Sequence, residues 1–116
     1  MDHLYSGIVT EGEERATKLG FPTVNIPLTG SDASGVYAAE VAFGGKRHPA
    51  VAFADQKRGI LEAHLLDFSG NLYGIAITIE LYDKLREAMR FENDAAIAEA
   101  IARDAEKARD YFATHA

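Results

Sequence analysis

Hydrophobic and polar positions alternate in short runs along the first 82 residues, and glycine, proline, asparagine and aspartate separate the runs. Such alternation is typical of half-buried β-strands, because successive side chains of a strand point to opposite faces. Gly44-Gly45 and Ser69-Gly70-Asn71 stand between runs and predict hairpin turns. The pattern therefore predicts six short antiparallel strands, at residues 4–10, 21–26, 35–43, 46–54, 60–68 and 72–82.

After Phe91 the apolar residues recur at spacings of three and four, which predicts a helix over residues 94–112. Asn93 can cap its first turn, and the acidic Asp94 suits the positive end of the helix dipole. One face of this helix is apolar and carries Ile97, Ile101, Ala105, Ala108 and Phe112. The opposite face is charged, so we expect the helix to lie on a barrel or sheet.

Six short strands at regular spacing indicate a small closed barrel. The predicted fold is one all-β-dominated domain over residues 1–116. It consists of a six-stranded antiparallel barrel at about 4–82, a loop at 83–92 and one C-terminal α-helix at about 94–112.

Composition limits the function classes. The chain has 116 residues, with 12 Lys and Arg against 18 Asp and Glu, and this net charge of −6 argues against binding to nucleic-acid phosphates. Cysteine is absent, which excludes thiolate chemistry, and no apolar run approaches the ~18 residues of a membrane span. The first residues lack the basic and apolar regions of a secretory signal. We expect a cytoplasmic monomer without nucleic-acid or membrane partners.

Two pairs of polar residues are candidates for chemistry. Thr23 and Asn25 stand two apart, so their oxygens share one side of an extended segment and can hold a hard cation between phosphates. Glu62 and His64 likewise share one face of a strand, and a carboxylate that faces a cleft can act as a general base. The structural alternative is that both pairs are surface residues on half-exposed strands.

Two loops complete the candidate set. Arg86 and Phe91 lie in the segment before the helix and could enclose an aromatic ligand, although a solvated linker has the same composition. The loop at 11–18 carries Gly12, Arg15 and Lys18, which favour an anion, together with three glutamates, which do not. The histidines at 3, 48 and 115 show no metal-ligand spacing and are predicted to lie at the surface.

Taken in order, these residues resemble the riboflavin kinase (flavokinase) family, which also forms the C-terminal part of bacterial bifunctional FAD synthetases. The resemblance extends from about Tyr5 to Tyr111. It rests on Ser6-Gly7-Ile8-Val9, Leu19-Gly20-Phe21-Pro22-Thr23-Val24-Asn25, Ser34-Gly35-Val36-Tyr37, Glu62-Ala63-His64-Leu65-Leu66-Asp67-Phe68, Leu72-Tyr73-Gly74, Leu85-Arg86 with Phe91, and the helix around Asp104 to Arg109. It implies a Greek-key barrel that transfers a phosphoryl group from ATP to the 5′-hydroxyl of riboflavin, giving FMN.

The resemblance also implies residue roles. Thr23 and Asn25 would hold Mg²⁺, or another divalent cation, together with the phosphates of ATP, and Glu62 would be the base. The other implied ATP-binding residues are Gly12, Arg15, Lys18 and Gly20, and the implied flavin-binding residues are Leu85, Arg86 and Phe91. Riboflavin and ATP are then the expected partners, with FMN and ADP as products.

The sequence departs from the family pattern in its first loop. Two glycines of that pattern are replaced by Glu14 and Ala16, and a basic residue by Thr17. Loss of glycine restricts the loop backbone, and added carboxylates repel a triphosphate. The acidic residue of the family's Leu-Arg-x-Glu run is replaced by Ala88 in this sequence. These departures support an alternative hypothesis, a non-catalytic module that binds a flavin or nucleotide, and a barrel that serves protein interaction is a third.

Overall fold

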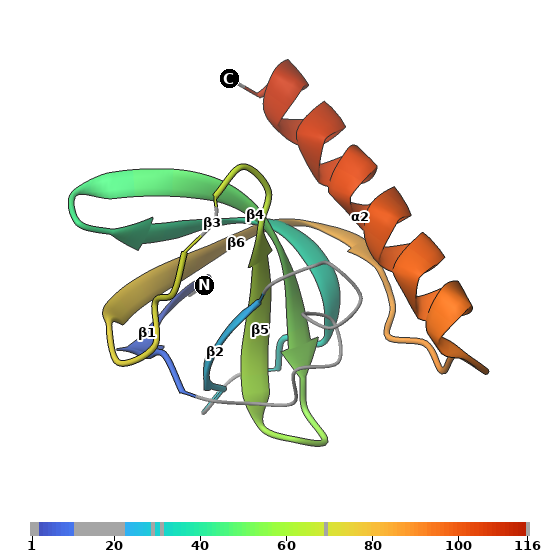
Figure 1. The fold of residues 1–116 in the computed structure, drawn as a ribbon, viewed down its shortest axis with the longest axis horizontal. Helices are drawn as coiled ribbons and strands as arrows, with labels where there is room; N and C mark the ends of the chain where they lie inside the picture. Colours follow the sequence, from blue (N-terminus) through green and yellow to red (C-terminus); the bar gives the residue numbers. More distant parts are fainter. Residues whose placement is uncertain (1–2, 11–22, 29, 31, 69, 116) are drawn as a thin grey trace.

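The computed structural model describes residues 3–10, 23–28, 30, 32–68 and 70–115. Within these residues six strands form a nearly closed antiparallel barrel, and one helix lies along its side (Figure 1). The elements are β1 (Leu4–Ile8), β2 (Val24–Pro27), β3 (Gly35–Phe43), β4 (Lys46–Asp55), β5 (Ile60–Leu65), β6 (Ala76–Arg86) and α2 (Asp94–Thr114). The predicted barrel and C-terminal helix are both confirmed.

The strands follow the order β1-β6-β3-β4-β5-β2 around the sheet. Within it, β6-β3-β4-β5 is a Greek key, because three consecutive strands are followed by a fourth that returns beside the first. The hairpin between β3 and β4 is confirmed, and Gly44 and Gly45 adopt the positive φ angles of 58° and 76° that such a turn requires.

The second predicted hairpin is wrong, because β5 pairs with β4 and β2 while β6 pairs with β3 and β1. The chain between β5 and β6 crosses to the β1 side of the barrel. There Gly74 donates a backbone hydrogen bond to Val9, and Val9 donates one to Ile75 (both 3.0 Å). These contacts place residues 72–75 outside the ladder and delay the start of β6 to Ala76.

Strand β6 also continues past its predicted end at Tyr82. Its pairing with β3 is irregular at two points, between Val36 and Tyr37 and between Tyr37 and Ala39. Extra residues on β6 at these bulges bend the strand and change the direction of its side chains. The predicted loop at 83–92 is therefore shorter at its start, and the bent end of β6 leads directly into the segment before α2 (Figure 1).

The barrel strands are apolar on both faces, which gives the domain two cores. Inward residues such as Ile26, Val41, Leu61 and Ile79 fill the barrel interior. Outward residues of β3 and β4 form a second core with the apolar face of α2; its buried members are Val36, Ala38, Val51 and Ala108. The site described below lies on this second, helix-covered face.

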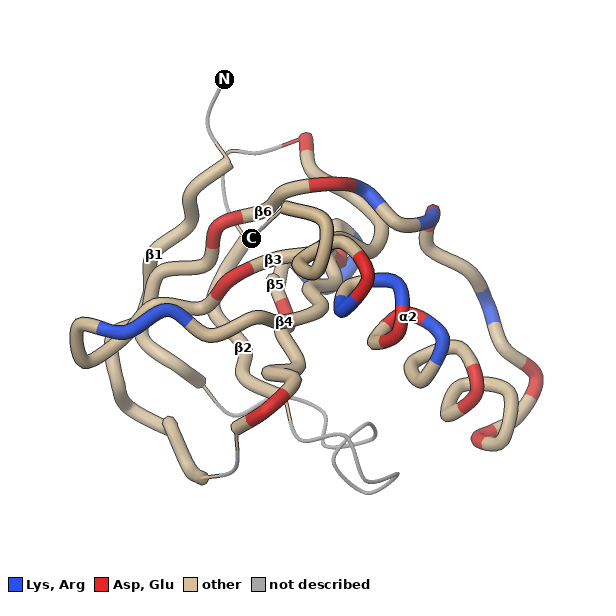
Figure 2. Tube along the Cα trace, turned by 90° about the horizontal axis from the view of Figure 1, so that it is seen from above, with Lys and Arg blue, Asp and Glu red and all other residues tan. Residues whose placement is uncertain are grey.

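Helix α2 begins as predicted, with the Asn93 side chain accepting a hydrogen bond from the Ala96 backbone N–H (2.9 Å). Its buried face is rotated from the predicted one, because the residues with least exposure are Ala100, Asp104 and Ala108. Acidic and basic residues both occur along α2 (Figure 2), and Glu99, Arg103, Glu106, Lys107 and Asp110 are exposed, as expected for its charged face. In the described part of the chain, no helix has the length and apolar character needed to cross a bilayer.

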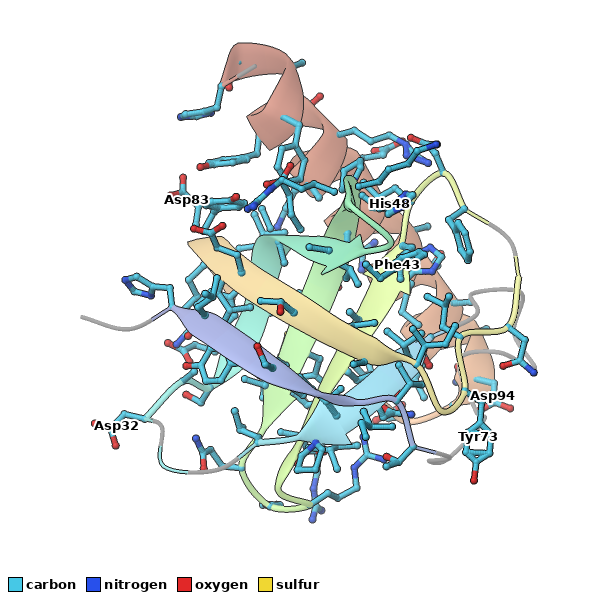
Figure 3. The ribbon with its side chains drawn as sticks, turned by 90° about the vertical axis from the view of Figure 1, so that its left-hand side faces the viewer. Asp32, Phe43, His48, Tyr73, Asp83 and Asp94 are labelled. Carbon is cyan, nitrogen blue, oxygen red and sulfur yellow. The ribbon has the colours of Figure 1, made fainter. Side chains whose placement is uncertain are left out.

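One of the predicted surface histidines is half-buried. The His48 ring stacks on Phe43 (centroid distance 4.6 Å; Figure 3), and Phe68 packs edge-on against both (5.4 Å each). Phe43 and Phe68 in turn contact the barrel core. His48 is thus part of an aromatic cluster at the end of the barrel, while His3 and His115 are exposed as predicted.

Candidate active site

Strand register brings the polar candidates to one face of the barrel. Asn25 lies opposite Glu62 in the β2–β5 pair, and Glu62 lies opposite Phe53 in the β4–β5 pair. Directly opposed residues of antiparallel strands point to the same side of the sheet. Glu62 and His64 share one face of β5, as the alternation predicts, and they face outward because Leu61, Ala63 and Leu65 are buried in the barrel. The site is therefore on the outer surface of the barrel, under α2.

Thr23, which immediately precedes β2, is held against Glu62. Its hydroxyl donates a hydrogen bond of 3.3 Å to Oε2 of the Glu62 carboxylate. The two residues are 39 positions apart in sequence, and only the β2–β5 pairing brings them together. Both are partly buried, so the contact is neither a surface pair nor sealed from a ligand.

Asn25 is the most buried polar residue of this face after Asp104, with 4% of its surface exposed. Its side-chain oxygen Oδ1 has no hydrogen-bond donor among the residues that the structure describes. Its backbone oxygen accepts a hydrogen bond from the backbone N–H of Thr10 (2.9 Å). A buried acceptor without a donor costs about 1–3 kcal/mol, so this oxygen is suited to a cation or a donor from a ligand.

A cavity of about 210 Å³ opens beside Thr23 and Glu62. Its walls come from β3, β4, β5, the end of β6 and the first half of α2. One part is apolar, with Val36, Val51, Phe53, Ile97 and Ile101. The other part is polar, with Thr23, Arg58, Glu62 and His64. Ala88, Met89 and Phe91 border it from the segment before α2, and Met89 is 64% exposed.

Arg86 borders the same cavity, but its guanidinium is already hydrogen-bonded within the protein. Its Nε and Nη2 atoms donate to the two carboxylate oxygens of Asp104, each at 2.9 Å. The guanidinium carbon lies 5.5 Å from the centroid of the Phe91 ring, a cation–π distance. Leu85, the third predicted flavin residue, packs instead against the helix-side core and is not among the cavity-lining residues.

Arg58 is a second cation at the cavity, and sequence reasoning missed it. Asp55 holds it through a 2.6 Å ion pair, and the same carboxylate accepts the backbone N–H groups of Lys57 and Arg58. Burial alone would raise the pKa of Asp55, but the hydrogen bonds from Arg58 and Lys57 outweigh it and keep the pKa below its ordinary value. The turn therefore fixes an Arg58–Asp55 ion pair whose guanidinium lines the same cavity as Glu62 and Thr23.

Asp104 was also missed as a site residue. Its position could be found from the helix spacing, because Ala100, Asp104 and Ala108 follow one another at intervals of four.

The predicted phosphate-loop residues Gly12, Arg15, Lys18 and Gly20 lie outside the described residues. Within the described ranges, no group of three histidine, aspartate or glutamate side chains could hold a metal ion. A metal ion at this site would be coordinated by hydroxyl and amide oxygens of the protein and by phosphate oxygens of a bound molecule.

Comparison with known proteins shows which family the chain resembles. A family model described as Flavokinase, riboflavin kinase, matches residues 1–112. The bifunctional riboflavin kinase/FMN adenylyltransferase of Escherichia coli (strain K12) is 40% identical over 116 residues, which covers 92% of this chain and 37% of the relative. The protein of the same description from Bacillus subtilis (strain 168) is 31% identical over 122 residues, covering 95% and 39%. The chain thus spans a little over a third of the length of these relatives.

A solved structure shows the same fold. A crystal structure from Streptococcus pneumoniae, described as a macrolide-efflux protein, superposes with a TM-score of 0.79 at 24% identity. It covers 91% of this chain and 38% of the other. At this identity the similarity concerns the fold alone, and it supports the six-stranded barrel with its C-terminal helix.

Proposed function

Because the chain belongs to the riboflavin kinase family, we propose that it transfers the γ-phosphoryl group of ATP to the 5′-hydroxyl of riboflavin. The observation that carries the proposal is the hydrogen bond between Thr23 and Glu62 at a cavity that has both apolar and polar walls. FMN and ADP would be the products.

The apolar and polar walls of the cavity suit the two parts of riboflavin. The flat isoalloxazine ring is apolar over its faces and can lie against side chains such as Val51, Phe53 and Ile101. The ribityl chain carries hydroxyl groups and would extend toward Glu62. Ligand sites commonly combine apolar walls with a few polar groups that fix orientation, and this cavity has that composition.

Phosphoryl transfer requires positioning and charge stabilisation more than covalent chemistry. Glu62 would accept the proton of the 5′-hydroxyl, the hydroxyl oxygen would form a bond to the γ-phosphorus, and the bond from that phosphorus to the β–γ bridging oxygen would break. ADP takes the electron pair of the broken bond. The Thr23 hydroxyl orients the Glu62 carboxylate at 3.3 Å, and the Arg58 guanidinium, paired with Asp55, lines the same cavity.

The residues present fit a hard divalent cation. Asn25 Oδ1 is a buried oxygen without a donor among the described residues, and the Thr23 hydroxyl lies two residues away on the same side. Neutral oxygens of this kind, completed by phosphate oxygens, are ligands that Mg²⁺ accepts. Thr23 and Asn25 would hold the ion, and the bound ion would neutralise charge on the phosphates.

The direct test is an incubation of the purified chain with riboflavin, ATP and MgCl₂, with FMN measured by chromatography. We expect FMN from the unaltered chain and a decrease of about 100-fold or more in kcat for Glu62→Gln, the usual loss when a general base is removed. Glu106→Gln on the exposed face of α2 is the matched control and should leave kcat unchanged. Equal turnover by Glu62→Gln and the control would refute the role of Glu62.

A second experiment tests the cation site. Calorimetry with ATP and Mg²⁺ should show binding to the unaltered chain and weaker binding to Asn25→Ala and Thr23→Val. Binding of ATP without Mg²⁺ should change less in these variants. If riboflavin quenching shows tight binding while neither ATP binding nor FMN is detected, the chain is instead a non-catalytic flavin-binding module.

A further inference from the structure

Asp104 is a charged residue in an apolar setting. Its side chain is 4% exposed, it lies on the buried stripe of α2 between Ala100 and Ala108, and it borders the cavity. Both carboxylate oxygens accept hydrogen bonds from Arg86 at 2.9 Å. Two parallel hydrogen bonds between guanidinium and carboxylate fix orientation as well as distance.

Arg86 has few donors left for a ligand. Nε and Nη2 bind Asp104, and Nη1 donates to the Glu87 backbone oxygen at 3.1 Å, so at least three of its five N–H groups are used within the protein. What Arg86 offers instead is its flat face, which covers the Phe91 ring at 5.5 Å. The pair therefore joins three elements: the end of β6, the middle of α2 and the segment between them.

The energetics favour a positioning role. Removing a buried ion pair from water costs about as much as the attraction between the charges returns, and apolar replacements are often equally stable. A buried pair therefore contributes geometry more reliably than stability. Here the geometry it fixes is the place of Phe91 at the cavity edge.

We propose that Asp104 is a positioning residue that acts through Arg86 to hold Phe91 against the isoalloxazine ring of riboflavin. The inference rests on the proposed function for the identity of the ligand. Arg86 then contributes to flavin binding without a hydrogen bond to the flavin. Loss of the pair should weaken riboflavin binding and leave the nucleotide end of the site unchanged.

The test measures riboflavin binding by fluorescence quenching without ATP. Asp104→Asn and Arg86→Lys should each raise the riboflavin Kd about tenfold, the size of a lost cation–π contact with its ring displaced. In turnover, the KM for riboflavin should rise and the KM for ATP should stay within about twofold. Asp67→Asn is the control. It removes the exposed ion pair between Asp67 and Arg109 of α2 (3.4 Å) and should change neither the riboflavin Kd nor the KM values.

A double variant separates positioning from stability. Arg86→Met with Asp104→Leu keeps the volume and removes both charges, so the chain should fold as stably as the unaltered one. Its riboflavin Kd should remain raised, and Phe91→Leu should weaken binding no further in that background. Recovery of normal riboflavin affinity in the double variant would show that the pair is only structural and would overturn the inference. Failure of the unaltered chain to bind riboflavin would instead count against the proposed function.

Discussion

Gly35 offers a quantitative test of how the site is built. It begins β3 with φ +98°, and a Cβ atom there would lie 2.7 Å from the backbone oxygen of Arg86 and 2.7 Å from the Lys84 side chain. Gly35→Ala therefore introduces two separate costs. The positive φ costs about 1–2 kcal/mol for an L-residue. The contact with the Arg86 carbonyl requires a backbone shift, which costs about a further 1–3 kcal/mol.

Gly45→Ala is the matched control. Gly45 has φ +76°, and a Cβ atom there meets nothing within 4 Å, so this variant carries the backbone cost alone. Urea unfolding followed by far-ultraviolet circular dichroism gives the unfolding free energy of each. We expect Gly35→Ala to be less stable than Gly45→Ala by about 1–3 kcal/mol, the cost of the contact.

The two variants should also differ in binding. Displacement of the Arg86 carbonyl moves the end of β6 and with it the guanidinium above Phe91. Gly35→Ala should therefore weaken riboflavin binding at a temperature where it is still folded, and Gly45→Ala should not. Equal losses of stability in the two variants would refute the assigned contact between Gly35 and β6.

Two further predictions concern the packing of α2 and the outer face of the barrel. Ala108 is fully buried between α2 and the barrel, so Ala108→Leu should lower the unfolding free energy by about 1–3 kcal/mol and weaken riboflavin binding, measured by urea unfolding and fluorescence quenching; unchanged values would contradict this packing. Burial raises the pKa of Glu40, but hydrogen bonds from Tyr82 and Arg47 outweigh it and keep the pKa below its ordinary value of 4.5. A lowered native pKa means stability that is present above that pH and lost as pH falls through the native pKa, so Glu40→Gln should flatten the acid limb of unfolding free energy against pH, and an unaltered slope would refute it.

The elements that local patterns determine were predicted well. The β3–β4 hairpin follows from Gly44-Gly45, and the start of α2 follows from Asn93, because turn and cap geometry depend on neighbouring residues. That Glu62 and His64 share one face follows from strict alternation along β5. These features required no knowledge of distant parts of the chain.

The errors arose where distant segments decide the structure. Ser69-Gly70-Asn71 resembles a hairpin turn, but which strand β6 pairs with depends on β1 and β3. The end of β6 depends on bulges, which no period-2 pattern reveals. The predicted apolar face did not include Asp104, since a charge is rarely buried without a partner, and its partner Arg86 lies 18 residues earlier on another element.

The position of β2 at the end of the sheet order has a dynamic consequence. In the described structure β2 pairs along its length with β5 alone, and a single bridge from Thr10 to Asn25 joins its other edge. A strand held mainly on one side opens more readily than the strands between two neighbours. Asn25 lies on this strand and Thr23 immediately before it, so a nucleotide bound there, as proposed, would stabilise the closed state of this strand. The backbone amides of β2 should therefore gain the greatest protection from hydrogen exchange when the nucleotide binds. Strand β2 would then report occupancy of the site as well as supply Asn25 to it.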